Sequence, residues 1–208
     1  MIQDVFRAFL ATYPPDSRGK LEPRTWSDQN TKTLVGCVPP NFTDFIREIA
    51  RPSHGSGILR FVLPEGELSL KQWNSSGGWA GDWKQWRTRL VVFAYDWLGR
   101  QIGFDRGRMK NGEPLIAMLE PGTGELLEIP ATFSTYITAE VIEAADAALA
   151  TKFYVQWKKS GGRAPRVGEC IGYRQPLFMG GGDTVDNLEV SDLRVYLSLC
   201  GQLVSKVG

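Results

Sequence analysis

The sequence predicts an α+β protein in which helices flank a central antiparallel β-sheet. Residues 90–95 are apolar at every position, which is typical of a strand with both faces covered. Gly99 can adopt the positive φ of a tight hairpin turn, and residues 100–105 return as the next strand. Segments with helical periodicity lie before and after the strands and do not alternate with them, which favours an α+β order.

The N-terminal part of the chain supplies two predicted helices. Apolar residues at helical spacing predict a helix over residues 2–13, which the proline at position 14 ends. Residues 16–33 are polar and predict a surface connection. Residues 41–49 then predict a second amphipathic helix, which ends before Pro52.

We expect the sheet to be an antiparallel meander. Short runs of β-forming residues, bounded by glycine or proline, predict three strands besides the central hairpin. These runs are residues 58–63, 115–119 and 126–129. Residues 106–112 are basic and contain glycine, and they predict a loop between two of the strands.

The C-terminal part of the chain predicts further helices around a short extended piece. A helical region begins with Thr138 as its cap and ends near Gly161. Residues 170–173 form the extended piece. Ser191 is the predicted cap of a last helix, whose apolar face runs to Val204.

Length and composition indicate an ordinary soluble protein. With 208 residues, we expect residues 1–33 to be a helix and connection packed on one α+β domain over residues 34–208. A net charge of +1 gives no sign of nucleic-acid or membrane-surface binding, and no apolar run approaches membrane-spanning length. We therefore expect a cytoplasmic protein with reduced cysteines.

The residue types that most catalytic sites need are sparse. The single histidine, His54, adjoins Ser53 in a glycine-rich turn, although a nucleophile and its base normally come from separate elements. No glycine cluster matches a phosphate-binding loop. The carboxylates of Asp183, Asp186 and Glu189 are more simply explained as turn and cap residues than as a calcium site. We expect no metal and no organic cofactor.

Two features could serve to bind a partner. Four tryptophans lie among glycines and serines over residues 65–89, and they either cover the sheet or form a recognition surface. Residues 111–151 hold seven carboxylates and no Lys or Arg, which is typical either of a solvated face or of a surface that steers a basic partner. The candidate partner-binding residues are Glu113, Glu120, Glu125, Glu128, Trp79 and Trp83.

Several motifs resemble the SUKH superfamily. They are the proline-preceded helix start at residues 40–45, the strand at 57–64 with its Gly-Ile-Leu-Arg-Phe run, and the aspartate-turn-glycine hairpin at 95–105. The C-terminal block resembles the immunity-protein domain of type VI secretion systems, through residues 169–181 and the final helix. It departs from that family's usual Leu-Gly-Gly motif because Met179 stands in place of the leucine. The similarity covers roughly residues 34–207.

The resemblance implies a SUKH-like fold and a binding function. Members recur as immunity proteins that neutralise bacterial toxins, many of them nucleases, and they share no catalytic residues. We therefore expect an antitoxin whose partner is a cognate protein toxin and that makes no direct contact with nucleic acid. The alternatives are a small cytoplasmic hydrolase that uses carboxylates, or an interaction scaffold with no immunity role, because a fold does not fix its partner.

Overall fold

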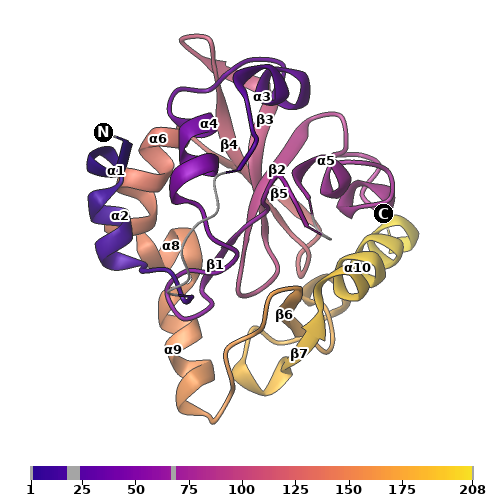
Figure 1. Cartoon of the computed structure of the whole chain (residues 1–208). Helices are drawn as coiled ribbons and strands as arrows, with labels where there is room; N and C mark the ends of the chain where they lie inside the picture. The colour runs from indigo at the N-terminus through magenta and orange to yellow at the C-terminus, as the bar shows by residue number, and fades with distance from the viewer. Residues whose placement is uncertain (1, 18–23, 67–68, 208) are drawn as a thin grey trace.

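The computed structural model describes residues 2–17, 24–66 and 69–207. Its main sheet has five antiparallel strands in the order β1-β2-β3-β4-β5 (Figure 1). The strands are β1 (Leu59–Phe61), β2 (Leu90–Asp96), β3 (Gln101–Lys110), β4 (Glu113–Glu120) and β5 (Glu125–Ile129). Each strand pairs with the next in sequence, as a meander requires. The predicted α+β class is confirmed.

The hairpin between β3 and β4 is longer than the sequence predicts. Residues 106–112 are not a loop, because β3 continues to Lys110, which pairs with Glu113 of β4. A shift in register after Asp105 accommodates this extension. Asn111 and Gly112 form the turn, both with positive φ, at 53° and 82°.

The N-terminal helices are α1 (Ile2–Val5), α2 (Arg7–Thr12), α3 (Asp28–Val35), α4 (Phe42–Asp44) and the π-helical η1 (Phe45–Ile49). Helix α3 begins inside the surface connection predicted over residues 16–33, so part of that connection is helical, and residues 18–23 lie outside the described chain. Ser27 and Asn30 form a capping box that begins this helix, and Gly36 ends it at φ 100°.

Helices cover both faces of the sheet (Figure 1). On one side lie the N-terminal helices, α6 (Phe133–Thr135) and α8 (Ala145–Leu149); on the other lie α5 (Leu70–Trp73) and α10 (Leu193–Val207). Phe93 of β2 is fully buried among aromatic rings, with centroid distances of 5.8 Å to Phe42, 4.9 Å to Phe104 and 5.4 Å to Phe133. This explains why residues 90–95 are apolar throughout.

The C-terminal block adds short helices and a second sheet. Its remaining elements are η3 (Tyr136–Glu140), α7 (Val141–Glu143), α9 (Thr151–Lys159), β6 (Glu169–Tyr173), η4 (Leu177–Met179), η5 (Val185–Asn187) and β7 (Leu188–Asp192). Strands β6 and β7 pair antiparallel. The cap of α10 is Asp192 and not Ser191, because the Asp192 carboxylate accepts the Val195 N–H at 3.0 Å while Ser191 pairs with Cys170 in the sheet.

Candidate partner-binding site

Two hairpin turns of the sheet meet the C-terminal block at the same end of the molecule. The turn after β2 is built on Asp96, whose Oδ1 accepts the N–H groups of Leu98 and Arg100, both at 3.0 Å. Gly99 lies in this turn at φ 79°, and a side chain there would approach Cys170 of β6 to 3.1 Å. The Ile171 N–H donates to the Trp97 carbonyl at 2.7 Å, so the turn is joined directly to β6.

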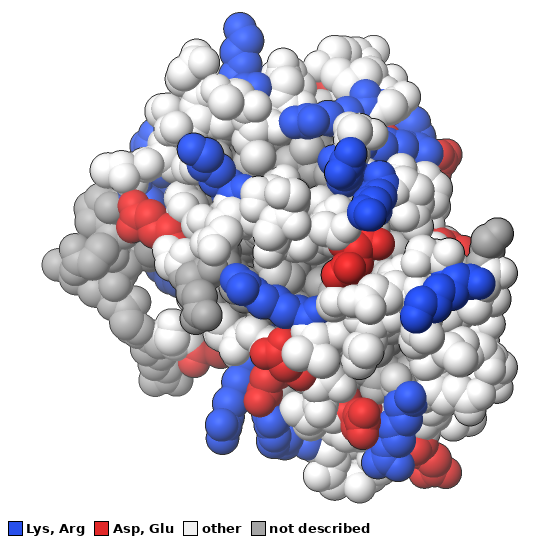
Figure 2. Space-filling model, turned by 90° about the vertical axis from the view of Figure 1, so that its right-hand side faces the viewer, with Lys and Arg blue, Asp and Glu red and all other residues white. Residues whose placement is uncertain are grey.

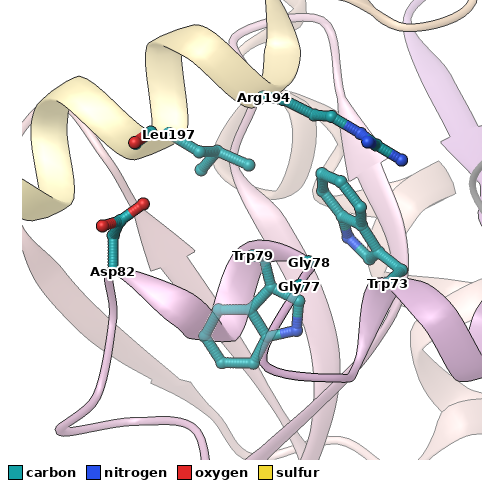
Figure 3. A pocket seen from close by; sticks show the side chains of 8 residues that line it. Trp73, Gly77, Gly78, Trp79, Asp82, Arg194 and Leu197 are labelled. Carbon is teal, nitrogen blue, oxygen red and sulfur yellow. The ribbon is translucent and has the colours of Figure 1, made fainter.

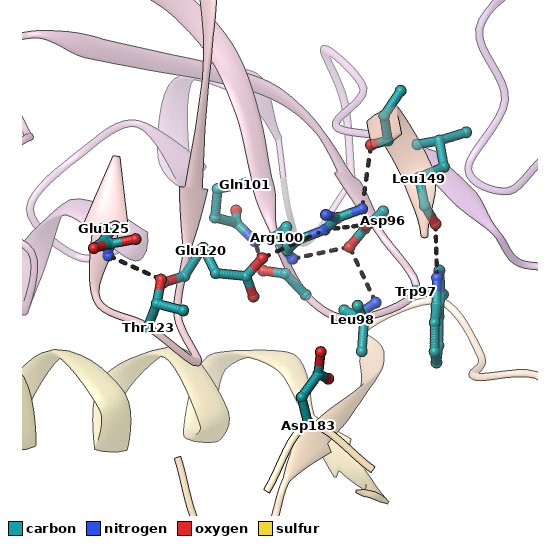
Figure 4. A network of polar contacts seen from close by, with 12 residues as sticks. Asp96, Trp97, Leu98, Arg100, Gln101, Glu120, Thr123, Glu125, Leu149 and Asp183 are labelled. Atoms are coloured by element: carbon teal, nitrogen blue, oxygen red, sulfur yellow. Dashed lines mark hydrogen bonds and ion pairs between the residues drawn. The ribbon is translucent and has the colours of Figure 1, made fainter. Parts of the chain in front are cut away.

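A buried ion network lies behind these turns (Figure 4). The Arg100 guanidinium contacts Asp96 Oδ2 at 2.6 Å, donates to the Ala148 carbonyl at 3.2 Å and lies 3.8 Å from Glu120 Oε2. Burial opposes the charge of Arg100, but the carboxylates of Asp96 and Glu120 outweigh burial and raise its pKa. Arg100 is therefore a fixed buried cation that links the two turns to helix α8.

Glu120, at the end of β4, has a strongly perturbed carboxyl group. Burial raises the pKa of Glu120 to about 7; the attraction of Arg100 opposes this rise, whereas the charges of Asp96 and Asp183 add to it. Its side chain is 12% exposed, so the carboxyl group still has access to the cleft in front of it. Glu120 thus changes charge near neutral pH.

The cleft in front of the network has a volume of about 490 Å³. Both hairpin turns form one wall, and segments of α8, α9, β6 and η4 form the other. It is lined by Leu98, Arg100, Glu120, Thr123, Asp146, Ala150, Lys152, Phe153, Gln156, Tyr173, Leu177 and Asp183. The lining combines apolar area with convergent charged groups, as is usual in sites that bind another molecule.

The charges of the cleft do not balance internally. Lys152 pairs with Asp146 at 3.2 Å, and Arg100 is held mainly by Asp96. Asp183 accepts the Tyr173 hydroxyl at 2.7 Å, and burial together with this carboxylate raises the pKa of Tyr173. Two carboxylates are therefore left without a cation of their own. Glu120 shares Arg100 with Asp96, and among the described residues Asp183 contacts only the neutral hydroxyl of Tyr173.

The four predicted glutamates do not share one acidic surface. Glu120 lies in the cleft and Glu125 is exposed beside it, across the β4–β5 turn. Glu113 is at the opposite end of β4, and Glu128 is paired with Arg89 and with Arg108, the latter at 3.4 Å. On the face shown in Figure 2, acidic side chains lie singly or in small groups, mostly beside Lys or Arg.

The predicted tryptophan anchors are part of the core and not of an exposed surface. Trp83 is fully buried and donates its indole N–H to the Leu197 carbonyl of α10 at 3.0 Å. Trp79, in the short helix η2 (Trp79–Gly81), is also buried and donates to Asn74 Oδ1 at 3.1 Å. The sequence left open whether these tryptophans cover the sheet or face a partner, and for Trp79 and Trp83 the contacts show packing in the core against α10.

A smaller pocket of about 190 Å³ lies between this tryptophan-rich segment and α10 (Figure 3). Trp73, Trp79 and Leu197 form its walls, and Asp82 and Arg194 lie at its rim. Its apolar walls belong to side chains that join α10 to the sheet. It is therefore a gap in that packing, smaller than the cleft and less rich in charged groups.

His54 is part of the core, where its ring joins two backbone segments. Its ring is fully buried between the Tyr13 carbonyl, 2.9 Å from Nδ1, and the Arg51 N–H, which donates to Nε2 at 3.1 Å. Burial lowers the pKa of His54 to about 4. Within the described ranges, no three His, Cys, Asp or Glu side chains converge to hold a metal ion, and no helix there is long and apolar enough to cross a membrane.

The C-terminal block carries the family similarity. Residues 134–204 match the family described as T6SS immunity protein Tdi1, C-terminal, over about a third of the chain. The match supports a type VI secretion immunity-type domain. Eight of the twelve residues that line the cleft lie inside the matched segment, and the other four come from the two hairpin turns. The SUKH assignment stays a prediction.

A solved structure shares the fold of the whole chain. The crystal structure of Atu4351 from Agrobacterium tumefaciens superposes with a TM-score of 0.61 at 15% sequence identity, covering 95% of this chain and 88% of that one. At this identity the likeness shows the fold alone. No curated protein matches the chain significantly.

Sequence reasoning missed Arg100, Tyr173 and Asp183 as site residues. A signal was present, because Asp96 and Glu120 each stand immediately before a predicted turn of the meander. In an antiparallel meander, successive strands end at opposite ends of the sheet. Asp96 ends the second strand and Glu120 ends the fourth, so the two carboxylates must lie at the same end of the sheet. Nothing in the local sequence shows that the C-terminal block folds back onto that end.

Proposed function

We propose that the protein is an immunity protein that binds and neutralises a cognate bacterial toxin. The observation that carries this proposal is the match of residues 134–204 to a type VI secretion immunity family, together with a charged cleft that this segment builds against the sheet. Of the four predicted glutamates, Glu120 lines the cleft, Glu125 flanks it, and Glu113 and Glu128 lie away from it. The part of the acidic tract that we propose to bind the toxin is therefore Glu120 and its neighbours in the cleft.

The chemistry of the cleft suits a basic side chain of the toxin. A guanidinium or ammonium group placed there would meet Glu120 and Asp183, and Leu98, Phe153 and Leu177 would pack against its aliphatic part. Toxins that cut nucleic acid present basic residues to phosphate, so a nuclease is the toxin class that this cleft fits. Such binding would neutralise the toxin by occupying groups that hold its substrate.

The proposal predicts that binding is linked to the proton on Glu120. With its pKa raised to about 7 by burial, this carboxyl gains or loses its proton near neutral pH. A bound cation lowers that pKa, so the complex releases a proton and becomes tighter as the pH rises from 6 to 8. Arg100, Asp183, Tyr173 and the Asp146–Lys152 pair line the same cleft, and Asp96 lies behind it against Arg100; none of these groups is changed in the experiment.

The test is a calorimetric titration against the toxin encoded in the adjacent reading frame, with survival of cells that express this toxin as the biological readout. The variants are Glu120→Gln and its matched control Glu125→Gln, an exposed glutamate across the same turn. We expect Glu120→Gln to lower the affinity about tenfold or more and to abolish the pH dependence. Glu125→Gln should bind as the wild type does.

Two results would contradict these statements separately. If the wild-type protein neither binds this toxin nor protects cells, the immunity function is wrong. If the wild-type protein binds and protects while Glu120→Gln retains full affinity and the same pH dependence, the function stands and the cleft is not the site.

A further inference from the structure

Helix α10 has an outward face that the described chain leaves uncovered. On this face Val195 and Leu199 are each 55% exposed and Val207 is 66% exposed. The opposite face of α10 buries Tyr196, Leu197 and other residues. In Figure 1, α10 lies at the edge of the molecule and runs outward to the C-terminus. A helix that is apolar on two sides exceeds what one packing surface requires.

The exposed residues follow a line along the helix. Asp192, Val195, Leu199, Gln202 and Lys206 are separated by three, four, three and four residues, the spacing of a seam on which two helices can pack. Leu203 and Val207 flank this seam on one side. One end of the seam is acidic and the other end is basic.

We propose that α10 docks antiparallel against α10 of a second copy of this chain, about a two-fold axis at Leu199. In this register Leu199 meets its own equivalent, and Val195 lies against Leu203 of the partner subunit. The same register brings Asp192 next to Lys206 of the partner subunit, and the two-fold axis repeats each contact. Apolar and charged pairs are thus satisfied together, as a self-complementary interface requires.

Both charged residues are available for this contact. Asp192 is exposed, and it uses Oδ1 to accept the Val195 N–H at 3.0 Å. Lys206 is exposed and has no ion pair within the described part of the chain. Antiparallel packing also places the C-terminus of each helix, the negative end of its dipole, beside the N-terminus of the other, the positive end, so the two helix dipoles attract.

A second copy explains the seam better than a toxin does. A toxin surface would need only apolar residues opposite Val195 and Leu199. Asp192 and Lys206, however, lie at equal distances on either side of Leu199, so in an antiparallel pair of α10 helices each acid meets the base of the other copy. One helix per subunit is a small contact compared with the interfaces of permanent dimers. We therefore expect a reversible dimer whose population depends on protein concentration.

The first experiment is sedimentation equilibrium of the full chain over a range of concentrations. We expect the average mass to rise from one chain towards two, and Leu199→Asp to keep it at one chain without changing the circular dichroism spectrum or the melting temperature. The matched control is Val155→Asp on α9, where the native valine is 48% exposed and lies outside the seam. This control should dimerise as the wild type does, and Lys206→Glu should weaken the dimer.

The second experiment is disulfide trapping, which depends on the two-fold axis. Leu199→Cys, in a Cys37→Ser background, should form a covalent dimer under mild oxidation because each residue 199 lies beside its own equivalent. Cys170 and Cys200 are buried and remain as they are. Val155→Cys in the same background should give little covalent dimer.

The proposal is overturned if the wild-type protein stays a single chain at every concentration. It is also overturned if Leu199→Asp dimerises normally, or if the two cysteine variants cross-link equally. If the wild-type protein is monomeric and Leu199→Asp loses toxin binding while Val155→Asp keeps it, the seam belongs to the toxin and not to a second copy.

Discussion

Two buried titratable side chains, Glu120 and His54, act on stability in opposite directions over the same pH range. Burial raises the pKa of Glu120 from 4.5 to about 7, so the folded state holds its proton more tightly and loses this stabilisation as the pH rises from 4.5 to about 7. Burial lowers the pKa of His54 from 6.5 to about 4, so stability falls as the pH drops from 6.5 towards 4. Between pH 4.5 and 6.5 the two contributions largely cancel.

Glu120→Gln should remove the contribution of Glu120 to the pH dependence of stability and leave that of His54. The variant removes only the carboxyl whose ionisation destabilises the fold, so it should match the wild type near pH 4 and be more stable at pH 8. The shift of the Glu120 pKa sets an upper bound of about 3 kcal/mol on the gain at pH 8. Urea unfolding of both proteins at the two pH values measures it, with Glu125→Gln as the control, and equal pH profiles would contradict the raised pKa.

At the scale of single residues, the sequence showed which residues were candidates for the site but not how deeply each one is buried. Glu120 was a candidate because it belongs to an acidic tract, yet its raised pKa comes from burial, with the charges of Asp96 and Asp183 adding to the rise, and only the folded chain brings these groups together. Trp83 was a candidate anchor because aromatic residues cluster around it, yet the Leu197 carbonyl and α10 cover it. Exposure depends on contacts between segments more than 100 residues apart, and no local pattern reports these contacts.

At the scale of elements, β2 is the strand on which the sheet depends. Phe93→Ala removes a fully buried ring that packs on Phe42, Phe104 and Phe133. Such a change costs about 3–5 kcal/mol, a large part of the stability of most domains. We expect the variant to unfold or to lose most of its stability in urea. Leu127→Ala on β5, where the native side chain is 42% exposed, should change the unfolding midpoint little.

Elements with a strong apolar period were predictable, and those defined by pairing or by caps were not. The five strands of the meander follow the predicted order because their alternation and turn residues are local signals. Helix α3 was missed because it buries only Thr31 and Val35, although Ser27 and Asn30 give the capping-box signal that marks its start. The extension of β3 to Lys110 depends on pairing with β4, which composition does not show.

At the scale of the whole molecule, the N-terminal helices and the C-terminal block share contacts with the sheet. Phe9 of α2 is fully buried and packs on Phe61 of β1, with ring centroids 6.0 Å apart, and on Phe45 of η1 at 5.9 Å. On the C-terminal side, the Trp97 indole donates to the Leu149 carbonyl at 2.9 Å. The segment that matches the immunity family is therefore anchored in the sheet, which supports our proposal that residues 34–208 form one domain with residues 1–33 packed on it.

This arrangement predicts that the chain unfolds in one cooperative step. Tryptophan fluorescence reports mainly on the segment from Trp73 to Trp97, and far-ultraviolet circular dichroism reports on all helices, including α10. The two signals should have the same midpoint in urea, because the Trp83–Leu197 hydrogen bond and the Trp97–Leu149 hydrogen bond join the regions that they observe.

Trp83→Phe makes this prediction sharper. It removes the hydrogen bond from the indole N–H to the Leu197 carbonyl, and the loss of one such bond costs about 0.5–1.5 kcal/mol. If the α10 contact belongs to the one cooperative unit, both signals should move to lower urea by the same amount. If only the circular dichroism transition moves, or if it splits in two, α10 unfolds separately from the sheet.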